Sequence, residues 1–233
     1  EKKDLFQHIK KTIEKQFDTY TSELYELASR LDQLKRPVII YIGGAPGTGK
    51  SMLATSLATR LGINKVISTD SIREIMRLAF SNDLLPTLFH STTEAWKGLP
   101  MEFQSSEQLI AGYCLQANQV SLGVRAVVER TVEEGENLIV EGAHLVPFLH
   151  EIAKKEMVDA YHIPITLSIM NEKHHRERFS ERGTKNLRKI ENFYLERFDG
   201  IRSIHEYTLT QCETDEVEVF DNEDLDETLN LII

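Results

Sequence analysis

Cysteine is scarce in this chain, and long hydrophobic runs are missing. Only Cys114 and Cys212 are cysteines, and they lie far apart. Their spacing is not that of a metal-binding motif, so we expect two buried, reduced thiols. No stretch of 18 or more apolar residues occurs, which argues against a membrane-spanning helix. The first residues, Glu1-Lys2-Lys3-Asp4, lack the apolar core of a signal peptide, and we therefore expect a cytoplasmic protein.

Positive charge is also in short supply. The 233 residues include 27 Lys and Arg against 37 Asp and Glu, which gives a formal net charge of −10 at pH 7. Because binding to a nucleic-acid backbone needs a surplus of Lys and Arg, we do not expect general nucleic-acid binding. The charge balance still allows a small phosphorylated ligand in a local basic pocket. The apolar fraction of 41% is that of an ordinary globular protein.

The most informative motif is a glycine-rich loop that follows the apolar run Val38-Ile39-Ile40-Tyr41-Ile42. The loop reads Gly44-Ala45-Pro46-Gly47-Thr48-Gly49-Lys50-Ser51, which is the G-x-x-x-x-G-K-S phosphate-loop pattern between a strand and a helix. Its glycines let successive N–H groups point at phosphate oxygens, and the following helix adds its positive N-terminal end. We expect residues 44–52, through Met52, to bind ATP. Lys50 is expected at the outer phosphates and Ser51 as a ligand of Mg²⁺. The alternative is a glycine-rich turn that binds nothing.

Apolar runs alternate with helical patterns along the rest of the chain. Strands are expected at about 37–42, 66–69, 138–140, 163–170 and 217–220, with the last near a sheet edge. Helices are expected at about 50–61, 71–79, 105–134 and from Ile190 through Ile204. This alternation predicts an α/β protein with the three-layer phosphate-loop NTPase fold: a five-stranded, mainly parallel sheet with helices on both faces. Since ligands bind beyond the carboxyl ends of such strands, Ser51, Asp70 and Glu141 should converge on one rim.

An amphipathic segment precedes this domain. Apolar residues from Leu5 to Leu34 recur at helical spacing and predict one long helix over 4–34, which ends before Pro37. We therefore divide the chain into an N-terminal helix at 1–36 and a phosphate-loop domain at 37–233. The simpler interpretation packs the helix on the domain. Homo-oligomerisation through this helix and the end of an upstream domain are the alternatives.

Two acidic residues at predicted strand ends are candidates for chemistry. Asp70 could accept the proton of an attacking hydroxyl or hold a magnesium-bound water, or it could only cap the following helix. Glu141 could support the metal or orient the nucleophile, or it could be a buried carboxylate bonded to backbone. Arg73, one turn after Asp70, could pair with a substrate anion. His144 is a weaker candidate for substrate contact, because a lone histidine is more often structural.

A charged segment at about 171–189 predicts a helical lid. Arg178 and Arg182 are four residues apart, so they share a helix face and could close over the transferring phosphoryl group. One such arginine can be worth ~10³–10⁵ in rate. The alternative is a set of surface ion pairs with Glu172, Glu177 and Glu181, worth about 0–1 kcal/mol each.

An irregular segment at about 80–104 is long for a connection inside a compact domain, which is typical of a lid or a binding insertion. It contains His90-Ser91-Thr92-Thr93-Glu94-Ala95-Trp96-Lys97, which combines hydroxyls, a histidine and a lysine beside an aromatic ring. We expect His90 and Lys97 to line an acceptor pocket. Trp96 alone is more often a core residue.

These segments together resemble the 2-phosphoglycerate kinase family of phosphate-loop small-molecule kinases, over about residues 38–222. The matching segments are the phosphate loop, 66–74, Thr93-Glu94-Ala95-Trp96, 123–130, 138–147, and His175 with Arg178-Phe179 and Arg182. The resemblance implies ATP-dependent phosphorylation of 2-phosphoglycerate at its 3-hydroxyl, giving 2,3-bisphosphoglycerate. An acidic acceptor agrees with Arg73, Arg178, Arg182 and Lys97. The alternatives are a kinase for another phosphorylated metabolite or a nucleotide, and a non-catalytic ATP-binding switch.

Overall fold

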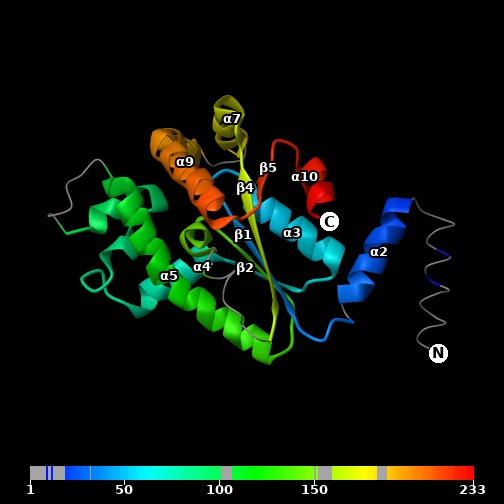
Figure 1. Ribbon diagram of the computed structural model, residues 1–233. Helices are drawn as coiled ribbons and strands as arrows, with labels where there is room; N and C mark the ends of the chain where they lie inside the picture. Colours follow the sequence, from blue (N-terminus) through cyan, green and yellow to red (C-terminus); the bar gives the residue numbers. More distant parts are fainter. Residues whose placement is uncertain are drawn as a thin grey trace.

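The computed structural model describes residues 9, 12, 19–31, 33–100, 107–149, 151, 159–182 and 188–233. In these ranges the strands are β1 (Val38–Gly43), β2 (Lys65–Ser68), β3 (Leu138–Glu141), β4 (Tyr161–Ser168) and β5 (Val219–Asp221). The α-helices are α2 (Thr19–Leu31), α3 (Lys50–Leu61), α4 (Thr69–Ala79), α5 (Gln108–Glu133), α7 (Glu172–Arg182), α8 (Arg188–Leu195), α9 (Phe198–Asp215) and α10 (Leu225–Ile232). Three 3-10 helices, η1 (Pro86–Phe89), η2 (Thr92–Gly98) and η3 (Ala143–Phe148), complete the elements (Figure 1).

The strands form one sheet in the order β2-β3-β1-β4-β5, and every pairing is parallel. The predicted five-stranded α/β fold is confirmed, with β5 at an edge as expected. Ile42 at the end of β1 and Ser68 at the end of β2 are both in register with Glu141. The carboxyl ends of three strands therefore lie at one level, where the phosphate loop and α4 begin.

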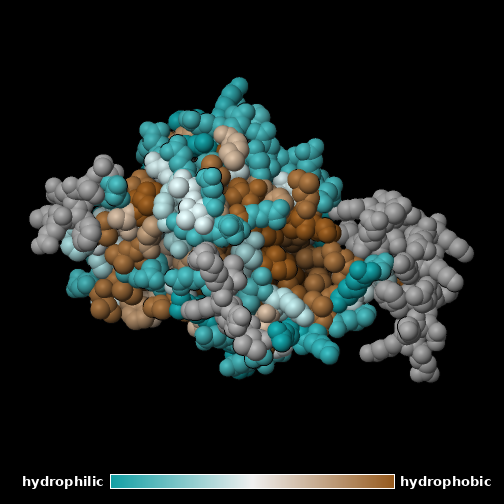
Figure 2. Space-filling model, viewed as in Figure 1, coloured by the Kyte–Doolittle hydropathy of each residue, from teal (hydrophilic) through white to brown (hydrophobic). Residues whose placement is uncertain are grey.

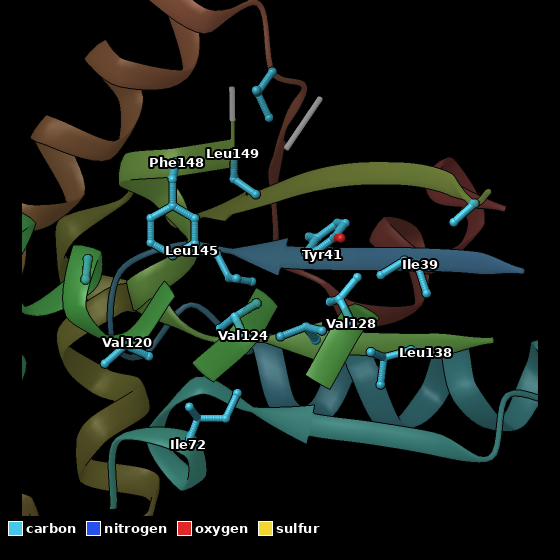
Figure 3. Packing of buried hydrophobic residues seen from close by; sticks show 14 of the residues in the cluster. Ile39, Tyr41, Ile72, Val120, Val124, Val128, Leu138, Leu145, Phe148 and Leu149 are labelled. Atoms are coloured by element: carbon cyan, nitrogen blue, oxygen red, sulfur yellow. The ribbon is translucent and has the colours of Figure 1, made fainter. Parts of the chain in front are cut away.

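The central strand β1 divides the hydrophobic core into two parts. Ile39 and Tyr41 face a cluster built with α5, α4 and η3, in which Val120, Val124 and Val128 of α5 line up along the sheet (Figure 3). The alternate residues Val38, Ile40 and Ile42 face a second cluster built with α3 and α10. Because β1 is buried on both faces, its sequence is a continuous apolar run, as is typical of central parallel strands. Each fully buried Ile, Leu or Val contributes about 1.5–3 kcal/mol.

Helix α2 packs against α3. Leu27 and Leu31 contact the α3 side of the core. Most of the predicted helix before Thr19 lies outside the described residues. In the part of the chain that the structure covers, none of the helices has the length and apolarity needed to cross a bilayer.

One predicted helix is in fact two. The pattern from Ile190 to Ile204 is divided between α8 and α9, because the backbone of Arg197 leaves the helical region (φ −109°, ψ 12°). There Arg197 forms an ion pair with Glu94 of η2 at 3.1 Å and stacks 3.9 Å from the Phe193 ring. This contact between distant segments holds the break.

The segment at 80–100 is not irregular throughout, since η1 and η2 pack against α5. Both cysteines are free thiols, with Cys212 buried as expected and Cys114 only partly so. Figure 2 shows that the surface is hydrophilic over α7, in agreement with the charged composition of that helix.

Candidate active site

The phosphate loop connects β1 to α3 and has the predicted glycine-dependent conformation. Gly47 has φ +87°, and a Cβ atom there would lie 2.3 Å from Cζ of Phe179, so only glycine fits. Lys50 is the first residue of α3 and is largely buried. Its Nζ donates to the carbonyl of Ala45 at 2.7 Å, which keeps the ammonium group over the loop.

A cavity of about 500 Å³ opens from this loop toward α4 and the 3-10 helices. Its lining combines the phosphate loop and α3 with the start of α4, the segment before η2, the end of β3, and one face of α8 and α9. The lining residues are Pro46, Gly47, Gly49, Lys50, Ser51, Ser68, Asp70, Arg73, Arg77, Phe89, His90, Ser91, Thr92, Thr93, Glu141, Ala143, Phe193, Tyr194 and Ile201. The predicted convergence of Ser51, Asp70 and Glu141 on one rim is therefore confirmed.

The side-chain oxygens of Ser51 and Glu141 lie side by side next to the loop. The Ser51 hydroxyl donates to Glu141 Oε1 at 3.0 Å. A hydroxyl and a carboxylate suit a hard cation such as Mg²⁺, which keeps most of its waters and binds few protein ligands. The described residues contain no group of three or more His, Cys, Asp or Glu side chains placed for a metal. The donor set fits Mg²⁺ bound together with phosphate oxygens.

Asp70 is not the cap of α4. Ser68 is the N-cap, because its Oγ accepts from the backbone N–H of Ser71 at 3.0 Å, while Asp70 lies in the first turn. The Asp70 side chain is 65% exposed and lies 3.5 Å from Nε of Arg73. Its carboxylate is thus available to a ligand in the cavity.

Two arginines on α4 face the same space. Arg73 donates to the carbonyls of Leu88 and His90, both at 3.0 Å, and pairs with Glu74 at 2.9 Å. Arg77 binds both carboxylate oxygens of Glu74 at 2.9 Å. Arg77 was not among the predicted site residues, although its position one turn after Arg73 was a usable signal. The cavity-lining roles of Phe193 and Tyr194 were not predicted either, and no local pattern marks them.

Three of the residues predicted to contact ligands do not line the cavity. His144 is fully buried behind the cavity wall, with both ring nitrogens bonded to Thr69 and Gln116. Lys97 pairs with Glu94 at 2.5 Å outside the lining, because η2 directs it toward that carboxylate. Met52 is exposed on the outer side of α3 and does not line the cavity. His90, in contrast, lines it as expected.

Helix α7 braces the phosphate loop from behind. His175 Nδ1 accepts from Arg202 at 3.3 Å, so its Nε2 carries the proton and donates to the carbonyl of Pro46 at 2.8 Å. Burial lowers the pKa of His175 to about 4, against a smaller opposing effect of the Pro46 bond, so the ring is neutral. Phe179, one turn later, lies against Gly47.

Arg178 is not part of the cavity lining, although its Nη1 lies beside Gly49 of the phosphate loop. It donates to the carbonyls of Asn222 and of Glu223, the latter at 3.0 Å, after β5. Asn222 in turn donates to the carbonyl of Thr48 at 2.8 Å, which ties the end of β5 to the phosphate loop. Asn222 was not among the predicted site residues, although it follows a strand at the ligand-binding edge. The side chain of Arg182 lies outside what the structure describes.

The phosphate loop at the end of the central strand, with a cavity beside it that both acidic and basic side chains line, defines a phosphate-loop nucleotide-binding protein. Residues 40–199 match the family described as "AAA domain", to which the chain belongs. The fold is similar to that of a solved shikimate kinase from Acinetobacter baumannii, in complex with shikimate. The TM-score is 0.50 at 13% identity, over 86% of this chain and 94% of that one.

Comparison with curated relatives identifies one family within this class. The chain is 38% identical to a 2-phosphoglycerate kinase of Methanopyrus kandleri, over 94% of this chain and 66% of the relative. It is 40% identical to that of Methanocaldococcus jannaschii (85% and 64%) and 39% identical to that of Pyrococcus furiosus (96% and 71%). The chain belongs to the 2-phosphoglycerate kinase family, and it spans about two thirds of the length of these relatives.

Proposed function

We propose that the protein transfers the terminal phosphoryl group of ATP to a hydroxyl of a small anionic metabolite. The proposed acceptor is 2-phosphoglycerate, and the product is 2,3-bisphosphoglycerate. One observation carries this proposal: a single cavity is bounded by the phosphate loop with Lys50 and by Asp70 with Arg73. The names of the relatives support the same acceptor.

On the nucleotide side, the loop amides and the Lys50 ammonium would bind the β- and γ-phosphates. Ser51 and Glu141 would hold Mg²⁺, which supplies charge neutralisation for the phosphates when it is bound. The bond between Ser51 and Glu141 keeps both oxygens oriented toward the loop. These residues therefore provide binding and orientation for the phosphoryl donor.

On the acceptor side, the Asp70 carboxylate accepts the proton of the attacking hydroxyl. The new P–O bond forms at that oxygen, and the bond between the γ-phosphorus and ADP breaks. Arg73 and Arg77 pair with the phosphate and carboxylate of the acceptor. Glu74 holds both guanidinium groups in place before the acceptor binds. Hydroxyls at Ser91, Thr92 and Thr93 supply neutral hydrogen bonds around the anion.

Three further predictions, made from the sequence, extend this proposal. Arg178 and Arg182 would stabilise the transferring group after α7 moves toward the cavity. The alternative role of the N-terminal helix is homo-oligomerisation. The protein would work in the cytoplasm.

An acceptor screen tests the function. ADP release is measured with 2-phosphoglycerate, its isomer 3-phosphoglycerate, unphosphorylated glycerate and nucleoside monophosphates, each with ATP and Mg²⁺. We expect turnover with 2-phosphoglycerate well above basal hydrolysis, and loss of that turnover in Lys50→Met. Preferred turnover of nucleotides would assign a different acceptor, and an absence of any acceptor effect would favour an ATP-binding switch. The product is identified by phosphorus NMR.

A further inference from the structure

A connected set of buried polar side chains lies behind the acceptor part of the cavity, and the proposed transfer does not use it. Thr69, His144 and Gln116 are each 0% exposed. They come from α4, η3 and α5, three elements that meet beside the cavity. Buried polar groups are destabilising unless they are hydrogen bonded, and a satisfied network of them fixes one arrangement of its elements.

The hydrogen bonds of this set have only one consistent direction. Gln116 Nε2 donates to the carbonyls of Thr87 at 2.6 Å and His90 at 3.0 Å, so its Oε1 is the atom that faces His144. His144 Nε2, 3.1 Å away, must therefore carry the proton. Its Nδ1 then accepts from the Thr69 hydroxyl at 2.8 Å. Burial lowers the pKa of His144 to about 4, which keeps the ring in the neutral form that this arrangement needs.

We call the hydrogen-bonded series Thr69–His144–Gln116 the relay. Its two ends lie beside residues of the proposed site. Thr69 directly precedes Asp70, the proposed acceptor of the hydroxyl proton. At the other end, the carbonyl of His90 receives both Gln116 and Arg73, each at 3.0 Å. His90 begins the segment through Thr93 that lines the cavity. The relay therefore joins the residue beside the proposed base to the loop that would contact the acceptor.

The backbone after β3 is shaped to allow this connection. Gly142 has φ +151°, and a Cβ atom there would lie 1.8 Å from Oγ1 of Thr69. A side chain at this position would displace the Thr69 hydroxyl from His144. The glycine thus lets η3 approach α4 closely enough for the first bond of the relay.

We propose that His144 and Gln116 are positioning residues that set the distance between Asp70 and the loop at 87–93, and thereby the affinity and alignment of the acceptor. Neither residue touches substrate. The inference rests on the proposed function, in which this loop binds the acceptor. A misplacement of about 1 Å at an acceptor can reduce rate by ~10²-fold, so a relay of this kind has a measurable effect.

Hydrogen exchange tests the relay without any substrate. The backbone N–H groups of Leu88, His90 and Glu94 are hydrogen bonded within the loop segment. In Gln116→Met and in His144→Leu we expect them to exchange about tenfold faster. The matched control is Thr131→Val, which removes a partly buried hydrogen bond further along the same helix. Equal exchange in this segment across wild type and relay variants would overturn the proposal.

Steady-state kinetics with ATP and 2-phosphoglycerate test the consequence. We expect kcat/KM for the acceptor to fall about 10–100-fold in both relay variants, while KM for ATP changes less than about twofold. His144→Gln, whose amide can still donate to Gln116, should recover part of the loss. Parallel losses for ATP and acceptor, or no recovery, would indicate general destabilisation and contradict a positioning role.

The two proposals fail in different ways. If wild type does not phosphorylate 2-phosphoglycerate, the proposed function is wrong, and the exchange experiment still decides the relay. If Gln116→Met does not fold, Thr69→Val breaks the first bond with a change of one polar group, and the same readouts apply. Exchange at 87–93 that stays at the wild-type rate in a folded Thr69→Val would also count against the relay.

Discussion

The stability of this protein should fall as the pH drops from 7 to 5, because three fully buried histidines must stay neutral. His144, His175 and His205 are each 0% exposed. Burial lowers the pKa of each to about 4, from the ordinary 6.5. Between pH 6.5 and 4 the unfolded chain therefore binds protons that the folded chain does not bind. The free energy of unfolding therefore rises with pH in this window. The stabilisation that the neutral histidines provide is complete above pH 6.5 and decreases as the pH falls from 6.5 to 4.

The magnitude follows from these pKa values. Between pH 7 and pH 5, each histidine lowers the free energy of unfolding by about 1–2 kcal/mol, where the smaller figure allows for solvent screening. Three histidines together give about 3–6 kcal/mol, a large part of the 5–15 kcal/mol typical of a domain. The pKa of Glu94 is lowered to about 2, mainly by Arg197 and then by Lys97. Protonation of Glu94 also lowers the free energy of unfolding as the pH falls, but this contribution changes only below about pH 5.

Urea unfolding monitored by circular dichroism at pH 7, 6, 5.5 and 5 measures the effect. The informative variant is His205→Gln, because His205 lies outside the cavity lining. Its Nε2 accepts a hydrogen bond from the N–H of Ile169 at 3.2 Å, and the side-chain oxygen of Gln can accept the same bond. We expect this variant to remove about one third of the pH dependence. The matched control is Thr208→Val on the same helix, which removes a buried hydrogen bond without removing a titratable group and should leave the pH dependence unchanged. A wild-type midpoint that is the same at pH 7 and 5.5, or a His205→Gln slope equal to wild type, would refute the reasoning.

Three further predictions concern the site. Lys50→Met should lower kcat by about 10²–10³ with little change in thermal unfolding, because it removes a charge from the phosphates; a variant that keeps wild-type turnover would contradict the role of Lys50. Asp70→Asn should lower kcat by about 10²–10⁴ and leave KM for ATP nearly unchanged, and a shift in KM for ATP alone would argue against a proton acceptor. Gly47→Ala should abolish ATP binding in calorimetry, since its Cβ would overlap Phe179. The control Gly62→Ala has φ +70° but open space, so it should lose only about 1–2 kcal/mol of stability and still bind ATP.

The sheet and the nucleotide half of the site could be predicted from the sequence because local patterns encode them. The run Val38–Ile42 is apolar on both faces, and the glycines and Lys50 follow it at fixed spacing. Because the ends of the parallel strands lie at one level, Asp70 and Glu141 must lie near the loop. This proximity can be predicted without knowing how the side chains pack. Helix α3 ends at Gly62, as the pattern predicted, because the residue there has positive φ.

The acceptor half could not be predicted in the same way, because it depends on contacts between distant segments. Arg197 interrupts a helical pattern to pair with Glu94, and Lys97 turns to the same carboxylate instead of the cavity. His144 was only a weaker candidate for substrate contact, and the sequence does not show that its ring bonds to the buried side chains of Thr69 and Gln116. Periodicity shows which residues are buried, but it does not show which polar groups meet inside.

The contact between α7 and the phosphate loop couples the position of this helix to the affinity of the loop for a nucleotide. Since His175 and Phe179 touch the loop from behind, any displacement of α7 changes how well the loop binds a triphosphate. Thermodynamic reciprocity then requires the nucleotide to bias the position of α7 by the same free energy. Protease sensitivity of α7 should consequently report nucleotide occupancy, and mutations on its outer surface should alter ATP affinity without touching the ligand.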